Sequence, residues 1–406
     1  MTLIAGLDVS KADVVVCLID TALPLPEPGK LYIESDFPRL KTDVQGLKTL
    51  LAMKPDACVL EPTGTNYSRF WCHKLKEAGI RLLLVSHSKV RRYRETILSE
   101  NKDDEGDALA LAYYGAQFEG QIGAFLRNRD PIAERLRELC HRLDHLNRMQ
   151  SPQVNRIRQD LAWQCPELAS KGLNAVVFWG WLAGERKSAL YDKVAAETIG
   201  SGITDYTREM ASLLIQLWPH EEKLTREMLD LLSDARFLPY RKVFARFGFG
   251  QKLEAILLSH IYPLSNFLGE DGLPMVVRTR SKKNPDKQTD KHLSERRFLK
   301  VLGCSPTREW SGKKQSGMKQ SRLAGSGQVR TALWQWVFTR IETKQATPKN
   351  LPSTGWEIDG VRVEGTLKEY FEYLKGAKTN IKLARSRLCA KTVKALFREL
   401  VEAGVK

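Results

Sequence analysis

The stretch LIAGLDVSK (residues 3–11) decides the fold of the amino-terminal part of this chain, because an apolar run of strand length ends there in a carboxylate. The apolar residues before Asp8 have the length and composition of a buried strand. A carboxylate at the end of such a strand is costly unless a cation meets it. The same arrangement recurs in ACVLEPTG (57–64), where Glu61 follows ACVL. Asp8 and Glu61 are therefore candidates for one cation-binding site.

A second pair of acids lies in NKDDEGDALALA (101–112). Asp104 and Asp107 are one turn apart at an expected helix start, so both can face the same point. Carboxylates gathered at one sheet edge suit Mg²⁺, which takes hard oxygen ligands. Two such ions can activate a nucleophile and stabilise a leaving oxygen in phosphoryl transfer. We predict that Asp8, Glu61, Asp104 and Asp107 bind Mg²⁺ and are catalytic; each acid taken singly could instead be an ordinary surface residue.

The order of the expected elements predicts an α/β domain. Strands are expected at 2–9, 13–20, 31–35, 57–61 and 81–85, and helices at 43–53 and 66–78, with two more to follow. Three strands followed by alternating helices and strands describe a mixed sheet covered on both faces. This order matches the ribonuclease H-like (RuvC-like) fold, whose metal-binding acids sit on the first and fourth strands and on a later helix.

The rest of the chain is expected to be mainly α-helical. Apolar residues alternate at spacings of four and three from Ile132 to Leu146 and continue to Leu161, with arginines between them. This heptad-like stripe predicts a long amphipathic helix or helical hairpin over 130–162, bent near Pro152. His141 and His145 could chelate zinc, although no third ligand lies nearby in the sequence.

The polar, basic segment 270–297 and the segment 345–363 are expected to be loops, and 366–403 helical. We predict a ribonuclease H-like catalytic domain over 1–125, a helical coiled-coil region over 126–236 and a carboxy-terminal domain with basic loops over 237–406.

Composition points to a polyanionic partner. The 406 residues carry a net charge of +16 and a sequence pI near 9.5, which favours nucleic acid over a small metabolite. Residues 1–60 contain six Lys or Arg and eight Asp or Glu. Residues 278–330 contain fifteen Lys or Arg and only four Asp or Glu, so the positive charge is concentrated there. The seven scattered cysteines form no CxxC pair and indicate reduced thiols. With no apolar run near the roughly 18 residues of a membrane span, we expect a cytoplasmic bacterial protein.

The basic block LGCSPTREWSGKKQSGMKQSRLAGSGQVRTALWQW (302–336) is dense in serine, glycine and cations. A serine hydroxyl attacks phosphorus only if it is deprotonated and oriented, and nearby Arg and Lys can neutralise the phosphate. Ser311, followed by a glycine and two lysines, is the best placed. The alternative nucleophiles are Ser305, Ser316, Ser321 and Ser326. A basic loop that only holds phosphate is the other interpretation of this block.

GLDVSK, LEPTG and NKDDEGDALALA resemble the three blocks of the Piv/MooV-like insertion-sequence transposases, which are DEDD-type recombinases guided by a bridge RNA. RLRELCHRLDHLNRMQSPQVNRIRQDL resembles the basic coiled coil of that family, and GCSPTREWSGKKQ with RLAGSGQVRTAL resembles its carboxy-terminal block. The resemblance covers roughly 1–160 and 300–335. Asp103 stands where the family has threonine, and the residues before Gly327 depart from the family's isoleucine-serine-lysine run.

The resemblance implies that Asp8, Glu61, Asp104 and Asp107 hold Mg²⁺ and that Ser311 attacks DNA to form a covalent phosphoserine. It also implies a homodimer or tetramer and target choice through a bridge RNA, with the protein binding DNA and RNA through phosphate and duplex shape. The expected nucleic-acid contacts are Lys11, Arg91, Arg92, Lys102, Arg148, Arg156, Lys313, Lys314, Arg322 and Arg330.

Three other functions remain open on the residues alone. A Holliday-junction resolvase would use the acids and water without a serine. An actin-like nucleotide-binding protein would need a second, DxGGG-type phosphate loop, which the sequence lacks. A DNA-binding architectural protein would leave the acids at the ends of buried strands unexplained.

Overall fold

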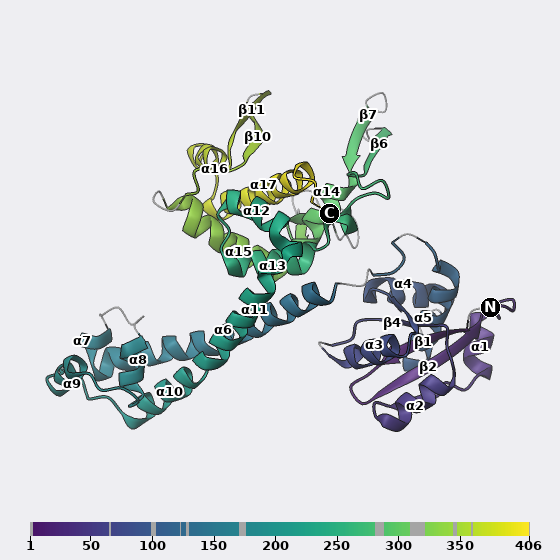
Figure 1. Cartoon of the computed structure of the whole chain (residues 1–406), viewed down its shortest axis with the longest axis horizontal. Coiled ribbons are helices and arrows are strands. Elements are labelled where there is room, and N and C mark those ends of the chain that lie inside the picture. The colour runs from purple at the N-terminus through teal and green to yellow at the C-terminus, as the bar shows by residue number, and fades with distance from the viewer. Residues whose placement is uncertain are drawn as a thin grey trace, which may run out of the picture. The chain divides into compact units, whose positions relative to one another are not determined.

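A computed structural model describes residues 3–64, 66–98, 103–121, 123–126, 130–169, 176–280, 288–308, 321–343, 347–358 and 360–405. The chain divides into two compact units, residues 1–128 and 129–406 (Figure 1). In the part of the chain that the structure describes, no helix is long and apolar enough to cross a membrane. The two units are described separately below.

A five-stranded mixed sheet forms the centre of the first unit. Its strands, in spatial order, are β3 (Arg39–Lys41), β2 (Asp13–Asp20), β1 (Leu3–Val9), β4 (Ala57–Leu60) and β5 (Arg81–Leu84). β1 pairs antiparallel with β2 and parallel with β4, and β4 pairs parallel with β5. The central strands are apolar at consecutive positions because both of their faces are buried. The predicted mixed α/β domain is confirmed.

Helices cover both faces of this sheet. Ala5 and Leu7 of β1 pack in one cluster with side chains of α2 (Val44–Ala52) and α3 (Tyr67–Glu77). Ile4 packs on the opposite face with α4 (His87–Ile97) and α5 (Asp104–Phe118). Successive side chains of a strand point to opposite faces of the sheet. The even-numbered residues of β1 therefore face α4 and α5, and the odd-numbered residues face α2 and α3.

The prediction of a strand over 31–35 was wrong. These residues belong to helix α1 (Pro28–Glu34), and the third strand in sequence is the short β3. Glu27 caps this helix by accepting hydrogen bonds from the backbone N–H groups of Gly29 and Lys30, at 3.1 and 2.7 Å. Pro28 suits the first helical turn, where its missing N–H is not needed. These local capping interactions outweigh the strand propensity of LYIES.

The second unit is mainly helical and contains two apolar cores. Its helices are α6 (Pro131–Gln164), α7 (Pro166–Ala169), α8 (Val176–Leu182), α9 (Ala189–Ala196), α10 (Asp205–Gln216), α11 (Trp218–Leu232), α12 (Leu238–Phe247), α13 (Gln251–Ile261), α14 (Leu293–Val301), α15 (Gly327–Trp336), α16 (Leu367–Gly376) and α17 (Ile381–Glu402). Figure 1 shows α7–α10 gathered at one end of the long helix α6 and α11 lying along it.

Helix α6 is continuous through Pro152 and its apolar stripe is buried within this chain. Leu136, Leu139 and Leu143 join the larger core with α11–α17, whereas Ile157 and Leu161 join the smaller core with α8 and α10. The predicted long helix is confirmed. A coiled coil with another chain stays a prediction, as does a domain boundary at residue 236.

Three antiparallel hairpins complete the second unit. They are β6 (Val276–Arg280) with β7 (Gln288–His292), β8 (Ser305–Arg308) with β9 (Ser321–Ala324), and β10 (Ser353–Ile358) with β11 (Val361–Thr366). The predictions of loops over 270–297 and 345–363 were therefore wrong. In the second case the sequence carries an Asp-Gly pair between two apolar-alternating runs, which is a strong hairpin signal.

Candidate active site

Asp8 and Glu61 lie side by side at one edge of the sheet. β1 and β4 run parallel with Leu7 paired to Leu60, so the residues after these two stand on neighbouring strands. Gly6 and Val59, two residues earlier in each strand, face α5. Because side chains alternate between faces, Asp8 and Glu61 also point to the face that α5 covers. The register of two strands thus places two predicted site residues together.

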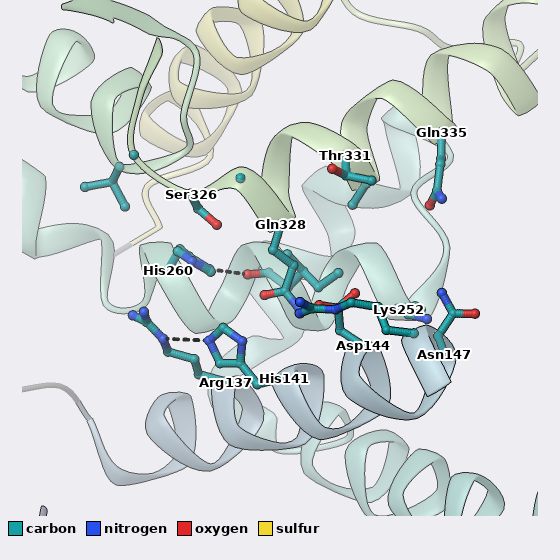
Figure 2. A pocket seen from close by; sticks show the side chains of 16 residues that line it. Arg137, His141, Asp144, Asn147, Lys252, His260, Ser326, Gln328, Thr331 and Gln335 are labelled. Atoms are coloured by element: carbon teal, nitrogen blue, oxygen red, sulfur yellow. Dashed lines mark hydrogen bonds and ion pairs between the residues drawn. The ribbon is translucent and has the colours of Figure 1, made fainter. Parts of the chain in front are cut away.

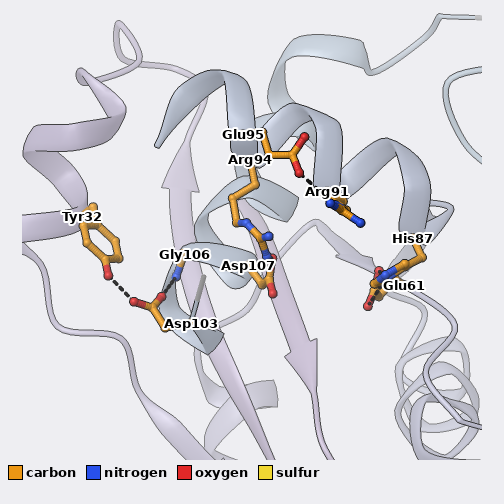
Figure 3. A network of polar contacts seen from close by, with 9 residues as sticks. All are labelled: Tyr32, Glu61, His87, Arg91, Arg94, Glu95, Asp103, Gly106 and Asp107. Carbon is orange, nitrogen blue, oxygen red and sulfur yellow. Dashed lines mark hydrogen bonds and ion pairs between the residues drawn. The ribbon is translucent and has the colours of Figure 1, made fainter. Parts of the chain in front are cut away.

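Helix α5 brings the other two acids to the same region. Asp103 is its N-cap and accepts hydrogen bonds from the Gly106 N–H, at 2.7 Å, and from the Tyr32 hydroxyl (Figure 3). Threonine and aspartate are both good N-caps, so the replacement noted in the sequence preserves this function. The cap fixes Asp104 and Asp107 in the first helical turn.

Glycine at position 6 allows α5 to lie directly on β1. A Cβ atom there would lie 2.1 Å from the Ala108 carbonyl oxygen and 2.4 Å from the Ala112 nitrogen. Gly115 makes a similar close approach to Val59 further along the helix. The site therefore depends on two small residues that carry no functional group.

Substituting Gly6 by alanine should displace α5 and cost roughly 1–3 kcal/mol of stability, the usual range for overpacking. We also expect loss of DNA cleavage, because Asp104 and Asp107 would move away from Asp8. Urea unfolding and a cleavage assay measure the two effects. Gly376→Ala is the matched control, since its new Cβ would meet no atom within 4 Å. Normal stability and cleavage in Gly6→Ala would refute the close-packing argument.

Three of the four acids contact a basic side chain. Asp104 binds Arg39 at 2.8 Å. Figure 3 shows the other two contacts, in which Asp107 binds the buried Arg94 and Glu61 lies 3.0 Å from His87 Nδ1. Sequence reasoning missed these partners. The burial of Arg94 could have been predicted from the sequence, because Arg94 lies four residues after Val90 and so shares the apolar face of α4.

Asp8 differs from the other acids because it makes no ion pair with any described residue. Its pKa is raised to about 7, first by burial and then by the negative charges of Asp107, Asp104 and Glu61, while Arg39 opposes the shift. The four acids therefore share one electrostatic environment, with negative charge that the neighbouring cations do not fully neutralise.

The donor set fits a hard divalent cation, although the carboxylates would have to turn from their present partners to bind one. Among the described residues, no three His, Cys, Asp or Glu side chains converge closely enough to hold a metal ion. His141 and His145 therefore have no third metal ligand beside them among the described residues. Carboxylate oxygens are nevertheless the ligands that Mg²⁺ prefers, and the excess negative charge around Asp8 is what such an ion would neutralise.

Several of the basic residues that we predict to contact nucleic acid have exposed side chains. Lys11 lies in the turn between β1 and β2, and Arg92 lies on α4. Arg91, Arg148 and Arg156 each form a pair with an acid four residues away. Such exposed pairs are weak, so phosphate can compete for these guanidinium groups. Lys102, Lys313, Lys314 and the side chain of Arg322 lie outside the described residues.

The serine block is described only in part. Ser311 and Ser316 belong to residues 309–320, which connect β8 to β9 in sequence and lie outside the described residues, as does the side chain of Ser321. Ser305 is half-buried in β8. Ser326 caps α15 by accepting a hydrogen bond from the Val329 N–H at 3.2 Å, so its hydroxyl already has a structural partner.

Arg330 stabilises the base of the β8–β9 hairpin. Its guanidinium donates to the carbonyl oxygens of Gly303 and Gly325, at 3.4 and 3.3 Å. Gly325 has a φ of +88°, and a Cβ there would lie 1.8 Å from the Lys300 carbonyl oxygen. This turn requires glycine, and Arg330 has a structural role besides the predicted contact with nucleic acid.

Comparison with known families gave two matches. Residues 5–166 match a model of DEDD transposases, and residues 288–351 match a model described as the transposase IS116/IS110/IS902 family. A comparison with curated proteins found no match. The first matched segment contains the four acids, and the second contains Ser311.

Proposed function

Because this chain belongs to the IS116/IS110/IS902 family of DEDD transposases, enzymes that act on DNA by phosphoryl transfer, we propose that it cuts and rejoins DNA strands through a serine nucleophile beside a Mg²⁺ site. The four acids would hold the metal, and Ser311 would attack the scissile phosphate. A bridge RNA would select the sites, and the active form would be a dimer or tetramer.

The electrostatic influence of Glu61, Asp104 and Asp107 on Asp8 at one end of the sheet is the observation that supports this proposal. The register of β1 and β4 accounts for Asp8 and Glu61, and the close approach of α5 at Gly6 accounts for Asp104 and Asp107. A mixed sheet with acids on its first and fourth strands and a later helix is the arrangement expected of a ribonuclease H-like nuclease. Bound Mg²⁺ would supply electrostatic stabilisation of the charge that develops on the transferred phosphate.

The acids and the basic residues would have different tasks in the reaction. In the proposed step the Ser311 hydroxyl loses its proton and its Oγ forms a bond to phosphorus. The bond from phosphorus to the leaving sugar oxygen breaks, and that oxygen takes up a proton, so the net proton transfer is from the serine to the sugar oxygen. Arg and Lys near the serine would neutralise the phosphate. Because the serine–DNA link is itself a phosphodiester that replaces the one broken, the strand can be rejoined without an external energy source.

The acids and the serine belong to different compact units of the chain, residues 1–128 and 129–406. An active site assembled from two units can be completed within one chain or between protomers. The proposed dimer or tetramer would complete the site by the second route.

Copurifying RNA provides the test of the whole proposal. We expect the protein to retain a discrete RNA species, and the complex to cleave element-end DNA only with Mg²⁺ and with that RNA present. Sequencing of the bound RNA and a cleavage assay after RNase treatment measure this. Full Mg²⁺-dependent activity after removal of all RNA would refute RNA guidance while leaving the acid site standing.

A further inference from the structure

A groove of about 830 Å³ with both polar and apolar lining residues lies between helices α6, α13 and α15 of the second unit (Figure 2). We call it the α6–α15 groove. Nothing in the catalytic proposal above uses it. Its volume falls within the range of pockets that hold molecules of nucleotide size.

Two rows of hydrogen-bonding side chains face the groove. The first row comes from α6 and consists of Arg137, His141, Asp144 and Arg148. The second comes from α15 and consists of Gln328, Thr331 and Gln335. Residues spaced by three or four positions share one helix face, so each row follows the length of its helix. The groove is therefore an elongated site with polar groups along both walls.

The groove carries an excess of positive charge. Arg137, Arg148 and Lys252 line it against a single carboxylate, Asp144, which pairs with Arg148. The Lys252 ammonium group, from α13, has no hydrogen-bond or ion-pair partner in the described ranges. No Phe, Tyr or Trp is among the lining residues, so the groove offers no broad platform for base stacking. These features suit a ligand rich in anionic oxygens.

The amino terminus of α15 adds backbone donors at one end of the groove. Gly325, Ser326 and Gly327 line this end, and the first-turn N–H groups of a helix favour phosphate. Gln328 joins the walls by donating from Nε2 to the Cys140 carbonyl oxygen at 3.1 Å. Its Oε1 is buried and has no partner among the described residues.

The same end of the groove adjoins the hairpin of the serine block. Gly325 follows β9 directly, and β9 pairs with β8 along its whole length, from Ser305 with Ala324 to Arg308 with Ser321. The segment that joins these strands in sequence contains Ser311. A ligand lying in the groove at Gly325 is therefore next to the end of β9, the strand that follows the segment containing the proposed nucleophile in sequence.

We propose that the α6–α15 groove binds the sugar–phosphate backbone of one nucleic-acid strand and holds that strand beside the β8–β9 hairpin. The proposal rests on the proposed function and adds to it a binding site on the second unit. DNA and RNA share the chemistry that the groove recognises, which is phosphate oxygens for the cations and for the amino terminus of α15.

Two substitutions in the full-length protein test the groove by different means. Lys252→Gln removes the unpaired charge, and Thr331→Trp fills the groove without changing charge; both positions are exposed, so the fold should tolerate them. The matched controls are Lys223→Gln on α11 and Thr339→Trp beyond α15, which are exposed and do not line the groove. The probes are fluorescent single-stranded DNA, single-stranded RNA and duplex DNA.

Lys252→Gln should weaken single-strand binding about tenfold at low salt, as expected for loss of one charged hydrogen bond, and should reduce the salt slope by about 0.7. Thr331→Trp should weaken the same binding with little change of slope, while both controls behave as wild type. An effect on DNA alone or on RNA alone identifies which strand the groove holds. Wild-type binding of all three probes by both groove variants would overturn the proposal.

The acid site gives an independent readout. If the groove variants bind normally and Asp8→Asn still abolishes cleavage, the groove inference fails and the proposed function stands. If the groove variants bind weakly but Asp8→Asn cleaves normally, the groove stands and the proposed catalytic site fails. Cross-linking of iodouracil-substituted strands, mapped to peptides containing His141 or His260, would support the groove location.

Discussion

DNA strand cleavage should fall by on the order of a thousandfold or more when Asp8 is replaced by asparagine, because the substitution removes a central anionic ligand from a site that stabilises transition-state charge. Binding of DNA and RNA should stay close to wild type, since the proposed nucleic-acid contacts are basic residues elsewhere in the chain. Cleavage of labelled DNA and binding of the same DNA in Ca²⁺ measure the two properties separately.

The same substitution should make the metal-free protein more stable above neutral pH. The pKa of Asp8 is raised from 3.8 to about 7 in the folded chain. Between these two pH values, the Asp8 carboxyl keeps its proton in the folded chain and has lost it in the unfolded chain. The stability contributed by protonated Asp8 is fully present below about pH 4 and is lost as pH rises through 7. Asparagine, being neutral, avoids that loss. In EDTA, the melting temperature of Asp8→Asn should exceed that of wild type at pH 8, with a smaller difference at pH 5.

Mg²⁺ provides the matching test of the metal site. A ligand that binds only the folded state raises its stability, so Mg²⁺ at pH 8 should raise the melting temperature of wild type more than that of Asp8→Asn. Asp36→Asn is a suitable control, because Asp36 is an exposed acid of the same unit. Equal responses to Mg²⁺ in wild type and Asp8→Asn would remove Asp8 from the metal site.

Ser311→Ala should eliminate the covalent protein–DNA adduct and, with it, strand exchange. Under the proposed mechanism the serine oxygen forms the bond to phosphorus, and alanine has no atom that can replace it. The expected result is complete loss of a denaturant-resistant adduct on labelled DNA, while DNA binding and Mg²⁺-dependent stabilisation persist. A suicide substrate with a nick near the cleavage site would trap the adduct in wild type.

Two control serines sharpen this test. Ser316→Ala should leave the adduct intact if Ser311 is the nucleophile. Ser326→Ala should cost about 1 kcal/mol of stability, because it removes the N-cap of α15, and should also leave the adduct intact. Continued cleavage by Ser311→Ala without an adduct would favour a Holliday-junction resolvase that uses water. An adduct that disappears in Ser326→Ala instead would reassign the nucleophile.

The sequence predicted much of the first unit because its signals are local. The strands that carry Asp8 and Glu61 were readable from apolar runs, and the spacing of Asp104 and Asp107 from helical periodicity. Helix α1 was missed because a cap at Glu27 and a proline outweighed the strand propensity of the following residues. Two hairpins were taken for loops because polar composition obscured their alternation.

The partners of the acids could not be predicted in the same way. Arg39 reaches Asp104 across 65 positions of sequence, and His87 reaches Glu61 across 26. Neither contact has a periodic signature, because each depends on which elements become neighbours when the apolar faces are buried. The α6–α15 groove is a stronger example, since Gln328 meets Cys140 across 188 positions.

By itself the sequence determined the mixed α/β domain and the long helix α6, and it predicted the four acids as site residues, because strand alternation, helical spacing and the cost of an unpaired buried charge all act over short stretches of chain. Only the tertiary structure decided how near the acids come to one another and which cations face them. The close contact of α5 with β1 at Gly6 and the opposition of α6 and α15 result from the packing of whole elements, where the absence of a single Cβ sets the distance between functional groups.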